Sequence, residues 1–145
     1  MNARVRHNGL FIDGKEIEAL SQSTFAVHSP ADGQIVGYAA LADHRDVERA
    51  VIAATNAFPR WNALTPAERE HCFLRAADLL EQASERFLPW IIDEGGSTIT
   101  KATFEWKYSI NLFRTAAGEV RRLYGDTFPA DRNDRLSLVI REPMG

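Results

Sequence analysis

The sequence lacks any apolar run of the length that a membrane-spanning helix needs, about 20 residues. Its first residues are basic and lead into a glycine-containing turn, not into the apolar centre of a signal peptide. A single cysteine occurs in 145 residues, so no internal disulfide can form, as is typical of reducing compartments. These absences predict a cytoplasmic protein without a membrane partner.

Concentrated positive charge is absent as well. Lys and Arg number 17 against 20 Asp and Glu, the net charge is -3, and no dense basic run occurs. Proteins whose main partner is nucleic acid or an anionic membrane usually carry a basic cluster. The sequence therefore predicts no nucleic-acid partner.

Recognisable catalytic motifs are missing too. None of the nine glycines forms a G-x-G-x-x-G or Walker A run, and the four histidines have no metal-ligand spacing. Cys72 falls on the apolar stripe expected for its helix. Its neighbour His71 points elsewhere, since adjacent helical residues do not face each other. We therefore interpret Cys72 as a buried packing residue, not as a nucleophile.

The first forty residues have the pattern of a small antiparallel β unit. Residues 10–17 predict a hairpin, because Asp13-Gly14 is a strong two-residue turn between apolar flanks. Residues 25–28 and 35–41 have strand character on either side of a Pro- and Gly-containing turn.

Helices are predicted to follow. The first begins at Asp43, which forms a capping-box pattern with Asp46, and ends at Pro59. The second begins after Thr65 and is kinked or split at Pro89, since proline cannot donate the helical hydrogen bond. The sequence as it stands therefore predicts an α+β fold.

The helix expected from Ser97 to Tyr124 has two apolar sides. One side repeats at helical spacing and comprises Ile99, Ala102, Thr103, Trp106, Ile110, Phe113, Ala117 and Val120. Phe104, Tyr108 and Leu112 lie on the opposite side. A surface helix needs one apolar stripe, so the second indicates packing, an interface or a ligand pocket.

The last predicted strand, residues 136–141, has no obvious partner, because residues 126–134 read as a polar loop. It would pair with the N-terminal strands, with another chain or with further sequence.

Six motifs in order resemble the N-terminal part of an aldehyde dehydrogenase. They are FIDGKE (11–16), FAVHSPADGQIVG (25–37), AFPRW with TPAER (57–69), LRAADLL (74–80), RLYGDTFP (122–129) and REPMG (141–145). The resemblance implies that the chain is part of the α/β aldehyde dehydrogenase fold. Residues 1–134 would be an incomplete hairpin and helical part of the cofactor-binding domain, and 135–145 the start of the oligomerisation β unit.

The resemblance also implies a function. Family members oxidise aldehydes to acids with NAD or NADP, using a cysteine nucleophile, a glutamate base and an oxyanion-binding asparagine. None of the three corresponding segments occurs here, so this chain has no predicted catalytic residue and is expected to be inactive alone. Homodimers or homotetramers are implied.

Three site residues follow from the matching positions. Phe104 and Tyr108 would face the aldehyde substrate, and Asp93 falls where some members hold a monovalent cation. From the residues alone, Asp93 and Glu94 are either a solvated helix end, which is favoured, or oxygen ligands for a hard cation. The run Glu94–Thr98 is similar to benzaldehyde- and vanillin-type members, which implies an aromatic aldehyde. The alternative is a non-catalytic helical interaction module, or a truncated pseudogene product.

Overall fold

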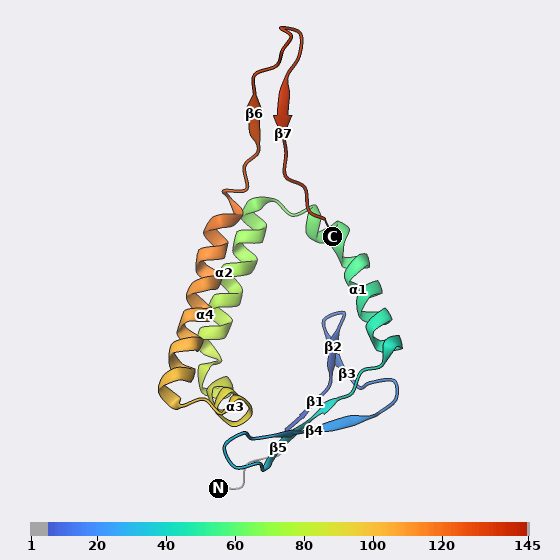
Figure 1. Ribbon diagram of the computed structural model, residues 1–145, viewed down its shortest axis with the longest axis vertical. Coiled ribbons are helices and arrows are strands. Elements are labelled where there is room, and N and C mark those ends of the chain that lie inside the picture. Colours follow the sequence, from blue (N-terminus) through green and yellow to red (C-terminus); the bar gives the residue numbers. More distant parts are fainter. Residues whose placement is uncertain (1–5, 145) are drawn as a thin grey trace.

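The computed structural model describes residues 6–144, so residues 1–5, which begin the basic N-terminal stretch, and Gly145 of the last motif lie outside it. The elements are β1 (Arg6–Asn8), β2 (Leu10–Ile12), β3 (Lys15–Ile17), β4 (Thr24–His28), β5 (Ile35–Ala40), α1 (His44–Asn62), α2 (Pro66–Gln82), α3 (Ser84–Gly95), α4 (Ile99–Val120), β6 (Asp126–Phe128) and β7 (Ser137–Val139). Figure 1 shows α2 and α4 side by side, α1 standing apart from them, and the β6–β7 hairpin projecting from the helices. The predicted α+β class is confirmed. In the described residues no helix is long and apolar enough to cross a membrane.

The N-terminal hairpin is confirmed. β2 and β3 pair antiparallel, and Asp13 and Gly14 both have positive φ (53° and 73°), as a type I′ turn requires. The purely antiparallel character predicted for the first forty residues is wrong in one respect. β1 pairs in parallel with β5, which pairs antiparallel with β4. The β2–β3 hairpin lies between β1 and β4 in the sequence. In the sheet, β5 is the central strand, with β4 on one side and β1 on the other.

The first helix begins as predicted but ends later. Asp43 and Asp46 form the expected capping box, and the helix continues past Pro59 to Asn62. Proline removes only the one hydrogen bond that residue 59 would donate, and Pro59 lies within a turn of the helix end. The Pro59 carbonyl keeps its helical partner, since the Ala63 N–H donates to it at 3.1 Å.

The second helix begins as predicted, with Thr65 and Glu68 in a capping box. The break falls at Ala83, not at Pro89, which lies inside α3. A contact from α4 reaches this position, because the Leu80 carbonyl accepts from Trp106 Nε1 at 3.2 Å as well as from the Ala83 amide at 3.1 Å. That carbonyl is the regular acceptor for residue 84, so a side chain distant in sequence helps to end α2 and turn the chain into α3.

Part of the first apolar side of the long helix packs as predicted, whereas Ile99 on its first turn is 60% exposed. Ala102, Ile110 and Ala117 are buried along α4. Small side chains let α2 approach closely, and Ala77 on α2 is completely covered. The helix runs from Ile99 to Val120, shorter at both ends than the predicted range of Ser97 to Tyr124, and Thr98 is its N-cap. The α2–α4 pair therefore holds most of the core of the described residues.

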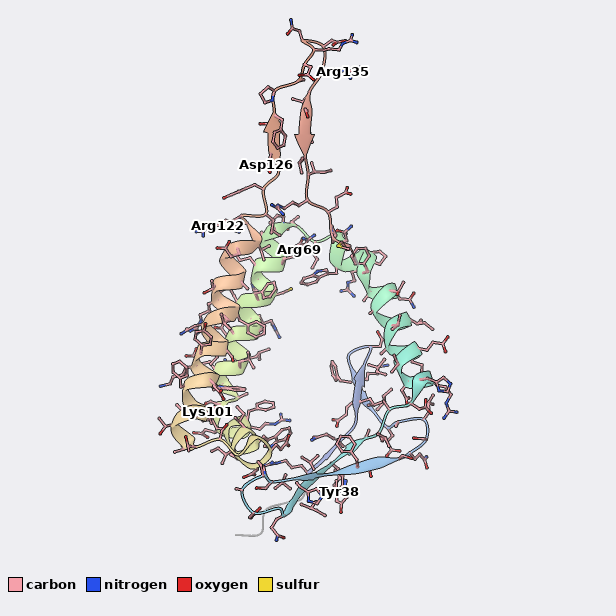
Figure 2. All side chains as sticks on the ribbon, viewed as in Figure 1. Tyr38, Arg69, Lys101, Arg122, Asp126 and Arg135 are labelled. Atoms are coloured by element: carbon pink, nitrogen blue, oxygen red, sulfur yellow. The ribbon has the colours of Figure 1, made fainter. Side chains whose placement is uncertain are left out.

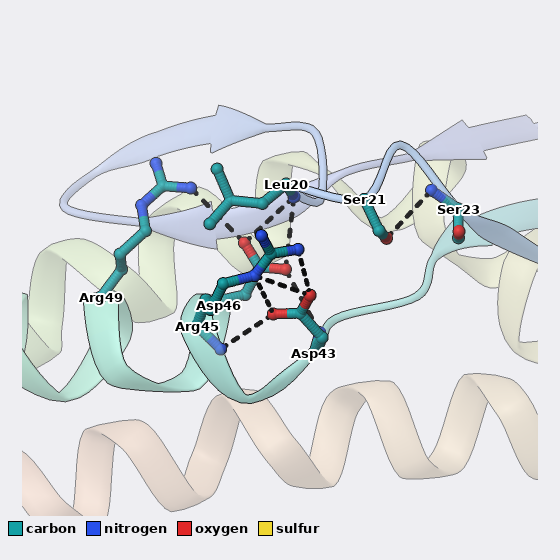
Figure 3. A network of polar contacts seen from close by, with 7 residues as sticks. All are labelled: Leu20, Ser21, Ser23, Asp43, Arg45, Asp46 and Arg49. Carbon is teal, nitrogen blue, oxygen red and sulfur yellow. Dashed lines mark hydrogen bonds and ion pairs between the residues drawn. The ribbon is translucent and has the colours of Figure 1, made fainter.

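Asp46 connects α1 to the segment between β3 and β4. Its side chain is 1% exposed and accepts from the Leu20 backbone amide, with 3.2 Å to Oδ1 and 3.3 Å to Oδ2, and from the Asp43 amide at 3.2 Å. Figure 3 shows this network together with the Arg45 side chain. The Arg45 guanidinium, which donates to Asp43, lowers the pKa of the Asp43 carboxyl to about 2. The start of α1 is thus fixed by charge and by backbone donors at once.

The last strand has a partner within the chain, so the expectation of an unpaired strand is wrong. β7 pairs antiparallel with β6, inside the segment predicted to be a polar loop. Gly125 permits the close approach, because a Cβ there would overlap the Val139 carbonyl. Arg141 Nε also donates to the Tyr124 carbonyl at 2.9 Å. The sequence does not predict β6, because its three residues, Asp-Thr-Phe, are too few to show an alternation of apolar and polar side chains.

Candidate functional site

The second apolar side of α4 is exposed. Phe104 is 66% exposed, Tyr108 55% and Leu112 51%, on the side of the helix away from its buried alanines. The Phe104 and Tyr108 rings stack, with centroids 5.9 Å apart and planes 11° from parallel. Lys101, labelled on the first turn of α4 in Figure 2, pairs with Glu105 at 2.9 Å beside them. The helix thus presents a flat aromatic surface with a neutralised charge pair at its edge.

Asp93 lies near the end of α3 and contacts a cationic side chain. Arg6 Nη2 donates to Asp93 Oδ2 at 2.7 Å, from a strand 87 positions earlier. The Arg6 guanidinium also lies over the Trp90 ring, 5.2 Å from its centroid. A carboxylate already paired with a guanidinium fits a further cation poorly, because the two positive charges repel each other. The role of Asp93 as a cation ligand stays a prediction.

Cys72 is exposed on α2, so its predicted burial is wrong. The helix packs on α4 through the side that carries Ala77 and Phe73, whose ring lies 6.2 Å from that of Phe113. Cys72 and His71 lie on the helix surface outside this contact. Within residues 6–144, no group of three or more His, Cys, Asp or Glu side chains is close enough to hold a metal ion.

One cavity was not foreseen from the sequence. It has a volume of about 410 Å³ and lies among β1, β3, β4 and β5. His7 and Tyr38, which line it, stack with their ring centroids 5.3 Å apart. They face each other because β1 pairs in parallel with β5 in a register that sets His7 opposite Tyr38. No local sequence pattern predicts that register, so only the structure reveals the cavity. Tyr38 is labelled in Figure 2.

Comparisons with known proteins give a consistent result. The model of the aldehyde dehydrogenase family matches residues 17–145. Salicylaldehyde dehydrogenase of Pseudomonas sp. (strain C18) is 34% identical over 136 residues, covering 94% of this chain and 28% of that protein. Vanillin dehydrogenase of Pseudomonas sp. (strain HR199 / DSM 7063) is 36% identical over 139 residues, covering 96% of this chain and 29% of that protein.

Solved structures agree with these relatives. A salicylaldehyde dehydrogenase from Pseudomonas putida G7, complexed with salicylaldehyde, superposes with a TM-score of 0.93 at 31% identity, covering 98% of this chain and 29% of that one. An NAD-dependent aldehyde dehydrogenase from Sinorhizobium meliloti superposes with a TM-score of 0.92 at 35% identity, covering 97% and 29%. This chain therefore spans under a third of the length of these relatives, and its structure matches part of their fold. The family resemblance read from the six motifs is confirmed, and the chain belongs to the aldehyde dehydrogenase family.

Proposed function

We propose that this chain is the N-terminal portion of an NAD(P)-dependent aldehyde dehydrogenase that oxidises an aromatic aldehyde to a carboxylic acid. One observation carries the proposal. Nearly the whole chain, 98%, superposes on a salicylaldehyde dehydrogenase complexed with its aldehyde while covering 29% of that enzyme. The chain supplies none of the catalytic cysteine, glutamate and asparagine segments of the family. Its contribution is a wall of the substrate site.

Phe104 and Tyr108 are the residues we assign to that wall. Both rings are more than half exposed and lie nearly parallel to each other, so much of the pair is open to contact with a ligand. Ligand pockets are lined mostly by apolar and aromatic groups. Aromatic rings prefer offset-stacked or edge-to-face contact with another ring. An aromatic aldehyde therefore gains more from this surface than a short aliphatic one does.

The nicotinamide cofactor would accept hydride in the complete enzyme. The start of the first helix does not fit its phosphates. The connection from β5 to α1 is the obvious strand-to-helix junction, and the carboxylates of Asp43 and Asp46 occupy the N-terminus of α1. These negative charges repel a phosphate at the place where a helix would otherwise attract one. We therefore propose that the cofactor contacts lie mainly in residues outside this chain.

We propose further that the β6–β7 hairpin contributes to a homodimer or homotetramer of a cytoplasmic enzyme. Both strands are exposed, and Leu136, Leu138 and Ile140 are each about half exposed or more. Exposed edge strands with apolar side chains are suited to pairing with further strands. Because β6 pairs with β7, the oligomerisation unit would include residues 126–144, a boundary earlier than the predicted one between residues 134 and 135.

The alternative proposal is a non-catalytic interaction module, or the product of a truncated pseudogene. The exposed Phe104, Tyr108 and Leu112 surface favours it, since a protein partner could cover the same face. The reading frame after codon 145 separates the two proposals. A family-like V-x-x-I-x-P-W-N segment there supports the enzyme, whereas a stop codon supports the module.

Activity measurements test the enzyme proposal directly. We expect the 145-residue chain to form no NADH or NADPH from benzaldehyde or salicylaldehyde, and the protein extended by its downstream reading frame to form it readily. The reason is that nucleophile, base and oxyanion donor act together, and all three are missing here. Cofactor reduction by the isolated chain would contradict the proposal, as would an extended protein that is folded but inactive on aldehydes.

Tyr108→Ala in the extended enzyme tests the substrate wall. We expect kcat/KM for an aromatic aldehyde to fall by about tenfold, with a smaller change for a short aliphatic aldehyde, because only the aromatic ring loses its stacking contact. Tyr124→Ala is the matched control, since Tyr124 is 68% exposed and lies beyond the end of α4. Equal losses for both aldehydes would show that Tyr108 acts through packing alone.

A further inference from the structure

Arg6 connects the β-sheet to the helices. Its side chain is only 18% exposed, although arginine is usually a surface residue. The guanidinium donates to Asp93 at 2.7 Å, lies 3.9 Å from Glu94 and covers the face of Trp90 at 5.2 Å from the ring centroid. Three side chains of α3, spaced over little more than one turn, thus surround one cation from β1.

One guanidinium faces two carboxylates here, so Arg6, Asp93 and Glu94 together carry a net charge of -1. Asp93 is 35% exposed and Glu94 38%, so both carboxylates are partly removed from water. The buried Arg6 Nη1 has no hydrogen-bond acceptor, and the Glu94 carboxylate lies 3.9 Å from it. An added cation beside Asp93 would lie close to the guanidinium, and the two positive charges would repel each other. Within the described residues no larger group of metal-ligating side chains exists to hold it.

We propose that Arg6 is the permanent counter-ion of Asp93, that it fixes the sheet to α3, and that Asp93 therefore binds no monovalent cation. The interaction resembles a cation site in its components, since a positive charge lies between carboxylates and an aromatic face. It differs from a site for a free cation because the positive charge is covalently part of the chain. The guanidinium belongs to the chain, so the link does not depend on the ions in solution and joins two elements far apart in sequence.

Hydrogen exchange of the 145-residue chain tests the link, because it reports local opening without requiring a single cooperative transition. The probes are peptides that contain β1 and α3. Arg6→Gln and Asp93→Asn are each expected to speed their exchange about tenfold, and the double variant is expected to add little beyond either single change. If Arg6→Gln leaves the chain unfolded, Arg6→Lys replaces it, which keeps the charge but loses the planar contact with Trp90.

Two controls complete the experiment. Arg132 and Asp134 form an exposed pair at 3.0 Å, so Arg132→Gln should leave exchange of β1 and α3 unchanged. Replacing tetramethylammonium chloride by potassium or sodium chloride at equal ionic strength should change the wild-type exchange rates less than twofold or so. A double variant that exchanges about a hundredfold faster would show independent side chains and overturn the proposal. Slower wild-type exchange specifically in potassium or sodium would overturn it too, because it would indicate a bound cation.

Discussion

Asp46→Ala is expected to lower the free energy of unfolding by about 3 kcal/mol, the largest stability effect that we expect from one side chain. The Asp46 carboxylate is almost completely buried and accepts from the amides of Leu20 and Asp43. Alanine leaves both donors without that acceptor and admits water poorly in its place. It also removes one half of the capping box of α1.

Urea denaturation followed by circular dichroism measures this loss. Glu48→Ala is the matched control, since Glu48 is an exposed acidic residue of the same helix. The free energy of unfolding of Asp46→Asn should lie between those of Asp46→Ala and Glu48→Ala. Its amide keeps one oxygen acceptor but lacks the negative charge near the helix N-terminus. An Asp46→Ala variant as stable as the Glu48→Ala variant would show that the buried network contributes nothing to stability.

Self-association of the isolated chain is the second large effect that we expect. Phe104, Tyr108 and Leu112 form an exposed apolar surface on α4, and the β6–β7 hairpin adds exposed strand edges. Water contact of each large apolar side chain costs about 1.5–3 kcal/mol relative to burial. Two or more copies can cover these surfaces, so sedimentation velocity should show oligomers whose fraction rises with protein concentration.

Serine substitutions on α4 separate the contribution of the helix surface to self-association from that of the β6–β7 hairpin. Replacing Phe104, Tyr108 and Leu112 together by serine should raise the concentration at which half the chain is associated at least about tenfold. The control variant replaces Lys107 and Asn111, exposed residues of the same helix, by serine and should associate like the wild type. A wild-type chain that remains a single monomeric species at every concentration would contradict the expectation.

Features decided within a few residues were predicted correctly. The Asp13-Gly14 turn, the capping box at Asp43, the helix start at Thr65 and the buried alanines of α4 all agree with the structure. Each depends on contacts between residues at most one or two turns apart, or on a repeat along one helix, and so is written in the local sequence. The family was recognisable for a related reason, since its six motifs mark turns and helix ends in a fixed order.

The errors occur where distant segments meet. The two prolines predicted helix breaks at residues 59 and 89. The chain instead bends at Ala83, next to the point where Trp106 donates a hydrogen bond to a backbone carbonyl of α2. The exposure of Cys72 depends on which side of α2 faces α4. Neither the bend at Ala83 nor the exposure of Cys72 can be predicted from neighbouring residues. A helix tolerates the one hydrogen bond that a proline removes when tertiary contacts compensate for it.

The sequence by itself determined the family, the class of the fold, the starts of α1 and α2 and the place of the aromatic pair on α4. Only the tertiary structure decided that β1 runs parallel to β5, that β6 pairs with β7, and that Arg6 meets Asp93. Helix starts and turns are stabilised by hydrogen bonds that close small rings along the chain. Strand register and long-range ion pairs are chosen by the total packing of segments up to 87 residues apart, which no local pattern records.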